Sequence, residues 1–416
     1  MLRVSGPQAR VALSALAATL PSPRRATLRT LRDPATGEPL DTALLLWFPG
    51  PDTATGEDLA EIQAHGGRST VRAIESALAT LPGLRLAQPG EFTRRALMNG
   101  RIDLAEAEGL ADLLSAETES QRKAALAVAG GTLSRAVAEW QDRLLGLSAR
   151  VEALLDFSDE ADVDADATVI ADISQQIQIV EMEWHDWLAR PSSERLRDGI
   201  SVAIAGPPNA GKSTLLNALA EREAAIVSSI AGTTRDIVEV PLALDGVPFR
   251  FADTAGLHSG TGDSIEAIGI ERAKTVIEAS DILLWLGDAD AAPSHPRLCR
   301  IVPQSDRSGE RADWNHRIEG ADLILSARTG EGMAALHHWL VATARHLLPG
   351  DSAVALNRRH RAALTSATDA LGDLHSDPLI LAEQLRAARL AIDRITGAAG
   401  TEAMLDALFG RFCIGK

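Results

Sequence analysis

The residues best suited to chemistry lie in a glycine-rich loop at 206–214, which carries a lysine and a serine at the spacing G-x-x-x-x-G-K-S. Glycines at these positions let backbone N–H groups close around phosphate oxygens. Lys212 supplies a positive charge to the β- and γ-phosphates, and the Ser213 hydroxyl can hold Mg²⁺. An apolar run at 200–205 precedes the loop and a Leu-rich stretch follows it. This order of strand, loop and helix predicts a nucleotide site of the phosphate-loop type.

Two later stretches add to this prediction. A loop with Gly232, Thr233 and Thr234 can place a threonine hydroxyl on Mg²⁺ and sense the γ-phosphate. Asp253 then ends an apolar run and can bind Mg²⁺ through water, while the backbone of Gly256 can approach the γ-phosphate. Gly-Thr-Thr alone is also typical of a plain turn. The three stretches in this order predict a Ras-like GTPase rather than a generic ATPase.

The stretch that should read the base departs from the usual Asn-Lys-x-Asp. The run Pro303-Gln304-Ser305-Asp306 keeps the aspartate, which can accept from the guanine N1 and N2 hydrogens. Pro303 has no side-chain amide, and Gln304 lacks the stem and charge of lysine. Unmade polar contacts are costly at such sites, so we expect weaker or less selective guanine binding. A later Ser326-Ala327-Arg328 at the end of an apolar run is typical of a base loop.

Composition excludes several classes of protein. The chain has 416 residues, of which 45% are hydrophobic and 24% charged, and its formal net charge is −16. This charge argues against coating nucleic acid by bulk attraction, though not against a local basic groove. The sequence has no apolar run long enough to span a membrane and no signal-peptide core. Two cysteines, Cys299 and Cys413, make no disulfide framework, which fits a cytoplasmic protein.

The chain divides into four segments by pattern. Residues 1–100 mix short apolar runs with Pro and Gly turns and predict an α+β domain. Residues 101–198 read as helices, 199–345 alternate strands and helices as a mostly parallel α/β sheet does, and 346–416 are helical again with a break near Asp377-Pro378. We therefore expect a multidomain α/β plus α protein, with a Ras-like phosphate-loop domain inserted into a helical bundle domain.

Ten stretches distributed along the chain carry a family resemblance. They are Trp47–Pro51, Gly56–Asp58, Gln63–Gly67, Pro89–Arg95, Asn99–Ala107, Gly206–Thr214, Ile230–Asp236, Asp253–Leu257, Ile268–Ala273 and Phe412–Lys416. With these stretches the chain resembles the MnmE (TrmE) family of bacterial tRNA modification GTPases over its whole length. The C-terminal Phe-Cys-Ile-Gly-Lys is the most specific of them.

The resemblance implies an architecture and an activity. The N-terminal domain would bind folate and form a homodimer, and the GTPase domain would be inserted into the helical domain. The protein would act with the flavoprotein MnmG (GidA), which carries FAD, in a heterotetrameric complex. Together they would add an aminomethyl or carboxymethylaminomethyl group to carbon 5 of the wobble uridine of certain tRNAs. The one-carbon unit would come from 5-formyltetrahydrofolate or a related tetrahydrofolate.

The resemblance also implies roles for residues around GTP. Asn209, Ser228, Ile230 and Thr233 match the positions that hold K⁺ when two G domains meet, and that cation replaces an arginine finger. Ser213 and Thr234 would hold Mg²⁺, and Glu266 would orient the attacking water. Read alone, Glu266 is an ordinary acid at a helix N-terminus. The implied GTP contacts are Asn209, Ala210, Gly211, Lys212, Ser213, Thr214, Ser228, Ser229, Ile230, Ala231, Gly232, Thr233, Thr234, Asp253, Thr254, Ala255, Gly256, Asp306, Ser326, Ala327 and Arg328.

Four further positions match those that hold formyltetrahydrofolate in the family, namely Arg3, Glu61, Arg101 and Lys416. A pterin offers a donor edge to a glutamate, and a glutamate tail suits arginine or lysine. The family carries a strand and a Gly-rich loop ahead of its Arg-x-Ser-Gly segment, whereas this chain enters at Leu2. Either the start codon is assigned too late or the strand and loop are missing, and in the second case we expect folate binding and dimerisation to be impaired. Cys413 could be a nucleophile or a small buried residue.

Other interpretations stay open. A GTP-dependent assembly factor would share only the G domain. A paralogue that binds nucleotide poorly, with weakened guanine selectivity, would act as a scaffold. His65 is expected to be structural. The basic run Arg358–Arg361 could contact tRNA phosphate or form a solvated helix face.

Overall fold

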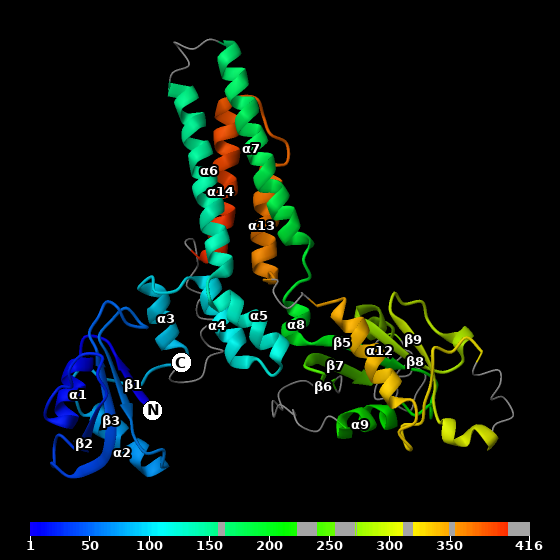
Figure 1. Cartoon of the computed structure of the whole chain (residues 1–416), viewed down its shortest axis with the longest axis horizontal. Coiled ribbons are helices and arrows are strands. Elements are labelled where there is room, and N and C mark those ends of the chain that lie inside the picture. The colour runs from blue at the N-terminus through cyan, green and yellow to red at the C-terminus, as the bar shows by residue number, and fades with distance from the viewer. Residues whose placement is uncertain are drawn as a thin grey trace. The chain divides into compact units, whose positions relative to one another are not determined.

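The computed structural model describes residues 1–156, 163–222, 239–253, 271, 273–310, 319–348 and 354–397 (Figure 1). These residues form two compact units. One comprises 1–111, 128–170 and the chain from 370 onward, and the other comprises 112–127 and 171–369. Within the described ranges, no helix is long and apolar enough to cross a membrane.

The N-terminal part is an antiparallel sheet of four strands with the order β1-β4-β3-β2. Its elements are β1 (Leu2–Ser5), α1 (Ala9–Ala17), β2 (Thr27–Arg32), β3 (Pro39–Phe48), β4 (Leu59–Gln63) and α2 (Arg68–Ala79). Alternating residues of β3, including Leu45 and Trp47, are buried and pack with apolar residues of α1 and α2. The register places Arg3 of β1 opposite Glu61 of β4. The α+β prediction for this segment is therefore confirmed.

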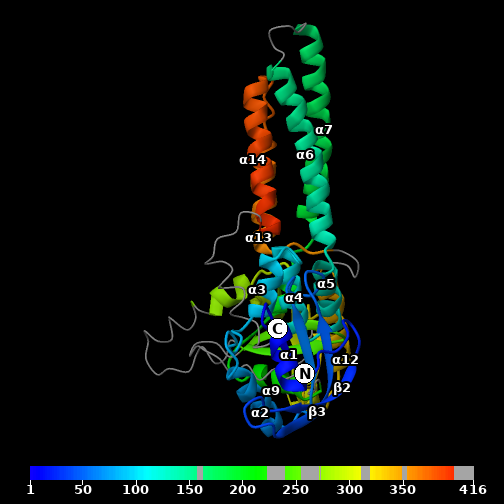
Figure 2. The same ribbon diagram turned by 90° about the vertical axis from the view of Figure 1, so that its left-hand side faces the viewer.

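Helices follow the sheet in the same unit. They include α3 (Glu91–Met98), α4 (Leu104–Ser115), α6 (Thr132–Asp156) and α14 (Pro378–Thr396). Asp103 and Glu106 bond each other's backbone N–H groups at 2.8 Å, and this reciprocal capping starts α4. α6 and α14 lie side by side (Figures 1 and 2). Gln141 of α6 joins them by donating to the Asp393 carboxylate of α14 at 2.5 Å.

The predicted break in the C-terminal helices is confirmed. α13 (Arg358–Leu371) ends before it, and α14 begins at Pro378. Proline suits the first helical position because its missing N–H would have no partner there. Asp377 caps α14 by accepting from the Leu379 backbone N–H at 2.8 Å.

The second unit contains a six-stranded sheet with the order β10-β9-β8-β5-β7-β6. The strands are β5 (Ile200–Ala205), β6 (Glu239–Leu244), β7 (Val247–Asp253), β8 (Ile282–Leu286), β9 (Leu298–Val302) and β10 (Leu323–Ile324). All pairings are parallel except that of β6 with β7. α9 (Lys212–Arg222) and α12 (Met333–Arg345) share one core with the sheet. Helical residues of 273–279 pack against a second small cluster. The mostly parallel sheet is the predicted one.

Three side-chain contacts join helices of this unit to each other and to the sheet. α5 (Glu119–Ala129) and α8 (Glu194–Asp198) meet where Gln121 donates to the carbonyl of Leu196 at 3.0 Å. Arg195 of α8 pairs with Asp281 at 2.8 Å, just before β8. Arg361 of α13 donates to the Leu188 carbonyl at 2.6 Å, at the end of α7 (Val163–Ala189). This use of Arg361 favours a structural role for part of the basic run.

Candidate functional site: a nucleotide site on the α/β sheet

The phosphate loop connects β5 to α9, and its shape depends on backbone conformations that few residues adopt. Gly206 has φ 150°, and a Cβ there would lie 2.4 Å from the Leu286 carbonyl oxygen at the end of β8. Gly211 has φ 96°, and Asn209 has φ 60° although it is not a glycine. A left-handed asparagine is tolerated better than most residues. The loop therefore curls tightly at the carboxyl edge of the parallel strands, where ligands bind in such sheets.

Lys212 lies under this loop at the start of α9. Its ammonium group donates to the carbonyl oxygens of Gly206 and Pro207, both at 2.9 Å, and the residue is only 4% exposed. Burial lowers the pKa of the Lys212 ammonium, and the nearby Asp253 carboxylate partly opposes that effect. A buried ammonium bonded to two neutral carbonyls has an incompletely neutralised charge, which favours an anion in the loop.

Ser213 and Asp253 come from different elements and meet beside the loop. The Ser213 hydroxyl donates to the Asp253 carboxylate at 2.5 Å, from the first turn of α9 to the last residue of β7. Both are hard oxygen ligands of the kind that Mg²⁺ prefers, so this pair fits a magnesium site that is completed by phosphate and water. Among the described residues, no group of three or more His, Cys, Asp or Glu side chains forms a metal cluster.

The base side is built around Asp306, which follows β9. The Ser326 hydroxyl donates to one carboxylate oxygen at 2.5 Å, and Arg328 donates to the other through Nε at 3.0 Å and a terminal nitrogen at 2.6 Å. These bonds, that of Ser326 first, lower the pKa of the Asp306 carboxyl. A carboxylate has about four acceptor positions and three are occupied here, so Asp306 keeps one free acceptor position, on the oxygen that Ser326 contacts. Accepting from two guanine N–H groups requires Arg328 to release one of its two bonds.

Sequence reasoning missed two supports of the base side. Glu331 accepts from the Ser305 hydroxyl at 2.6 Å, and its carbonyl accepts from the Ser326 backbone N–H at 2.9 Å. Its place in Thr-Gly-Glu-Gly, directly after the predicted base loop, was the available signal. Gln304 has φ 63°, and its side-chain amide is 3.5 Å from the Asn209 carbonyl oxygen. Nothing in a single sequence indicated that left-handed conformation.

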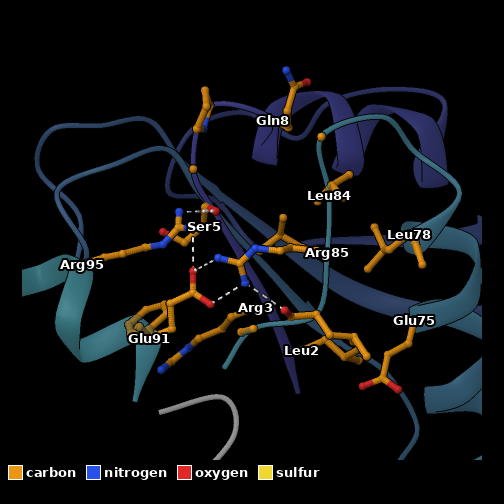
Figure 3. A pocket seen from close by; sticks show the side chains of 18 of the residues that line it. Leu2, Arg3, Ser5, Gln8, Glu75, Leu78, Leu84, Arg85, Glu91 and Arg95 are labelled. Atoms are coloured by element: carbon orange, nitrogen blue, oxygen red, sulfur yellow. Dashed lines mark hydrogen bonds and ion pairs between the residues drawn. The ribbon is translucent and has the colours of Figure 1, made fainter. Parts of the chain in front are cut away.

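The N-terminal part has a pocket of about 390 Å³, shown in Figure 3. Arg3 lines it and pairs with Glu61 at 3.0 Å, and its guanidinium lies 5.0 Å from the centre of the Phe92 ring. Glu91 is held by two bonds from Arg85, at 2.7 and 2.8 Å, and by one from Arg95 at 2.9 Å. These bonds, that of Arg85 first, lower the pKa of Glu91 to about 2.

The surroundings of the other residues considered in the sequence analysis are as follows. Arg101 does not line the pocket and pairs with Asp52 at 3.5 Å. The Nδ1 atom of His65 lies 2.8 Å from the Asp41 carboxylate, and the imidazole is exposed. Cys299 is buried in β9, and burial raises the pKa of its thiol to about 12. Several predicted residues lie outside the described residues, namely Ser228, Ser229, Ile230, Ala231, Gly232, Thr233, Thr234, Thr254, Ala255, Gly256, Glu266, Cys413 and Lys416.

Comparisons with known proteins agree along the whole chain. A family model described as the GTP-binding protein TrmE N-terminus matches residues 1–101, and one for the MnmE helical domain matches residues 104–413. The chain is 57% identical to the tRNA modification GTPase MnmE of Sphingopyxis alaskensis, over 100% of both chains. It is 56% identical to the proteins of that name from Rhizorhabdus wittichii and Erythrobacter litoralis, over 100% of this chain and 93% and 96% of theirs.

Proposed function

Because the chain belongs to the MnmE (TrmE) family of tRNA modification GTPases, we propose that it hydrolyses GTP in the modification of a tRNA wobble uridine. The observation that carries the proposal is the phosphate loop, where Lys212, Ser213 and Asp253 converge at the carboxyl edge of the sheet. The proposed division remains the four segments 1–100, 101–198, 199–345 and 346–416, and the proposed location is the cytoplasm.

The described residues supply binding and charge for this reaction. Backbone N–H groups of the loop and the start of α9 bind the phosphates, and Lys212 neutralises charge on the β- and γ-phosphates. Ser213 and Thr234 would hold Mg²⁺, and Asp253 would hold it through water; when bound, the ion stabilises the charge that develops during phosphoryl transfer. Asp306 selects guanine by accepting from N1–H and the N2 amine. The bonds from Ser326 and Arg328 lower the pKa of Asp306, so this acceptor stays ionised to lower pH.

K⁺ activation and G-domain dimerisation are part of the proposal. Asn209 stands exposed on the phosphate loop, where its side chain could hold a monovalent cation together with Ser228, Ile230 and Thr233. A cation there would supply the positive charge that an arginine finger gives other GTPases. Glu266 is the proposed residue that orients the attacking water.

Hydrolysis by the purified protein tests the proposal. GTP and ATP are compared in KCl and in NaCl, with Glu266→Ala and with the exposed Glu221→Ala as a matched control. We expect GTP-selective hydrolysis that K⁺ raises over Na⁺ and that only Glu266→Ala abolishes. Hydrolysis that does not distinguish K⁺ from Na⁺ would reject K⁺ activation. An absence of GTP hydrolysis in all of these salts would reject the GTPase assignment.

The N-terminal pocket is the proposed site of 5-formyltetrahydrofolate or a related tetrahydrofolate. Its support is the placement of Arg3, which joins the pocket wall to Glu61 and lies over Phe92. Arg101 and Lys416 remain proposed contacts. Calorimetric titration with 5-formyltetrahydrofolate should show weaker binding by Arg3→Gln. The exposed Arg29 of β2 gives the control Arg29→Gln, which should bind as the wild type does.

The proposed partners are a second copy of the chain, MnmG with its FAD, and tRNA. The departures at Pro303 and Gln304 favour one alternative, a GTP-dependent assembly or scaffold protein with weakened guanine selectivity. Affinity purification distinguishes the tRNA modification function from the assembly or scaffold function. Recovery of MnmG supports tRNA modification, whereas recovery of ribosomal subunits without MnmG favours the alternative.

A further inference from the structure

Two strained residues meet in the nucleotide site. Among the described residues, five that are not glycine have positive φ, namely Ala18, Arg24, Asn209, Asp245 and Gln304. Asn209 and Gln304 come from different loops, yet the side-chain amide nitrogen of Gln304 lies 3.5 Å from the Asn209 carbonyl oxygen. Residues held in this conformation cost free energy and persist where the surrounding structure imposes them, often at ligand sites.

The residues around Gln304 restrict the position of its side-chain amide. Pro303 before it is buried, and Asp306 two residues later is tied to Ser326 and Arg328. A Cβ built at Gly211 would lie 3.7 Å from the same amide nitrogen. The amide therefore lies against the phosphate loop between its asparagine and its second glycine. The 3.5 Å separation is at the long limit of a hydrogen bond, as is common before a ligand tightens a site.

We propose that Gln304 is a positioning residue that joins the base-reading loop to the phosphate loop, so that a purine held at Asp306 fixes the backbone of Asn209. The inference rests on the proposed GTP site and goes beyond it. It gives a role to the residue that stands where a lysine would be expected. Gln304 donates to the phosphate loop without bringing a positive charge next to Asn209, the proposed ligand of K⁺.

Substitutions of Gln304 that change its side-chain donor, length or charge can test this positioning role. Gln304→Gly relieves the left-handed backbone and removes the amide. Gln304→Asn keeps an amide on a stem one carbon shorter and tolerates positive φ well. Gln304→Lys keeps a donor and adds a charge, and Gln304→Glu turns an acceptor toward the Asn209 carbonyl. A role confined to backbone shape would make the glycine and asparagine variants bind nucleotide at least as well as the wild type.

The experiment measures the affinity of each purified full-length variant for a fluorescent GDP, together with the K⁺ concentration that half-activates hydrolysis. Loss of one neutral hydrogen bond is worth about 1 kcal/mol, so Gln304→Gly and Gln304→Asn should bind about 5-fold more weakly. Gln304→Glu should lose more, and Gln304→Lys should bind as tightly as the wild type or more so. The added charge of Gln304→Lys should raise the half-activating K⁺ concentration about 2-fold or more.

Thermal unfolding of each variant shows whether it is folded, and Gln304→Gly keeps the proposal testable if a bulkier variant does not fold. Wild-type affinity in Gln304→Gly and Gln304→Asn overturns the inference and leaves the GTPase proposal standing. Failure of the wild type itself to bind the nucleotide overturns both. Weaker binding by these two variants that Gln304→Lys restores supports the inference.

Discussion

The phosphate side and the base side of the nucleotide site differ in whether backbone or side chains determine their geometry. On the phosphate side the geometry is carried by backbone, with Gly206 packed against the Leu286 carbonyl and Lys212 bonded to loop carbonyls. On the base side it is carried by side chains, chiefly the contacts of Asp306 with Ser326 and Arg328. Side chains can be exchanged singly, whereas a backbone path constrains every residue along it. This difference explains why the departures from the expected pattern lie at Pro303 and Gln304 and not in the phosphate loop.

The comparison predicts its largest effect at Gly206. Gly206→Ala would place a Cβ 2.4 Å from a backbone oxygen of β8, so either the strand or the loop must move. Gly246→Ala is the matched control because Gly246 also has positive φ, but a Cβ there would meet nothing within 4 Å. We expect nucleotide affinity to fall about 100-fold or more for Gly206→Ala, while Gly246→Ala loses about 1 kcal/mol of stability and no affinity. Equal affinities of the two variants would contradict a backbone-built phosphate side.

Lys212 should give the next largest effect. Lys212→Ala removes the charge that faces the phosphates, and hydrolysis should fall about 100-fold or more because such contacts stabilise the transition state. Steady-state hydrolysis of GTP is the measurement. Lys274→Ala, an exposed lysine in the same unit, should leave the rate unchanged. A similar loss in both variants would mean that the charge of Lys212 has no local role.

Asp306 tests whether one side chain can change the base that is chosen. Asp306→Asn replaces an acceptor with a group that also donates, which suits the oxygen at C2 of xanthine better than the amine of guanine. GTP affinity should fall about 100-fold, since the N2 amine loses its acceptor and N1–H is left with a neutral one, and XTP should become the better ligand. Competition binding with GTP and XTP measures this, and Asp290→Asn, on an exposed turn, is the control. Unchanged preference for GTP would show that Asp306 does not read the base.

The sequence predicted the elements whose signals are local. The strand before the phosphate loop, Asp253 at the end of β7 and the break before Pro378 follow from apolar runs, glycine spacing and proline, and each is found where it was expected. The contacts of Gln304 with Asn209 and of Ser305 with Glu331 were not predictable in this way. Each joins separate loops, and their proximity depends on the strand order of the sheet. Arg3 and Arg101, which the family resemblance put together, pair with Glu61 and Asp52, and these pairings too join residues far apart in the sequence.

Arg328 should give the smallest effect, because its side chain is 73% exposed and exposed ion pairs contribute little. Arg328→Gln should weaken GDP binding about 2-fold at pH 7, where Asp306 is ionised with or without its partner.

At acidic pH the difference in GDP affinity between Arg328→Gln and the wild type should become larger. Arg328 helps Ser326 to hold the pKa of Asp306 below its ordinary value, so the wild type keeps its ionised acceptor to lower pH. Without Arg328 that pKa moves back up, and affinity should start to fall at a higher pH as the solution is acidified. Fluorescent GDP titrations between pH 7 and pH 4 measure this, with Arg307→Gln, an exposed arginine one residue after Asp306, as the control. Superimposable pH profiles for all three proteins would mean that Ser326 alone sets the charge of the base-reading carboxylate.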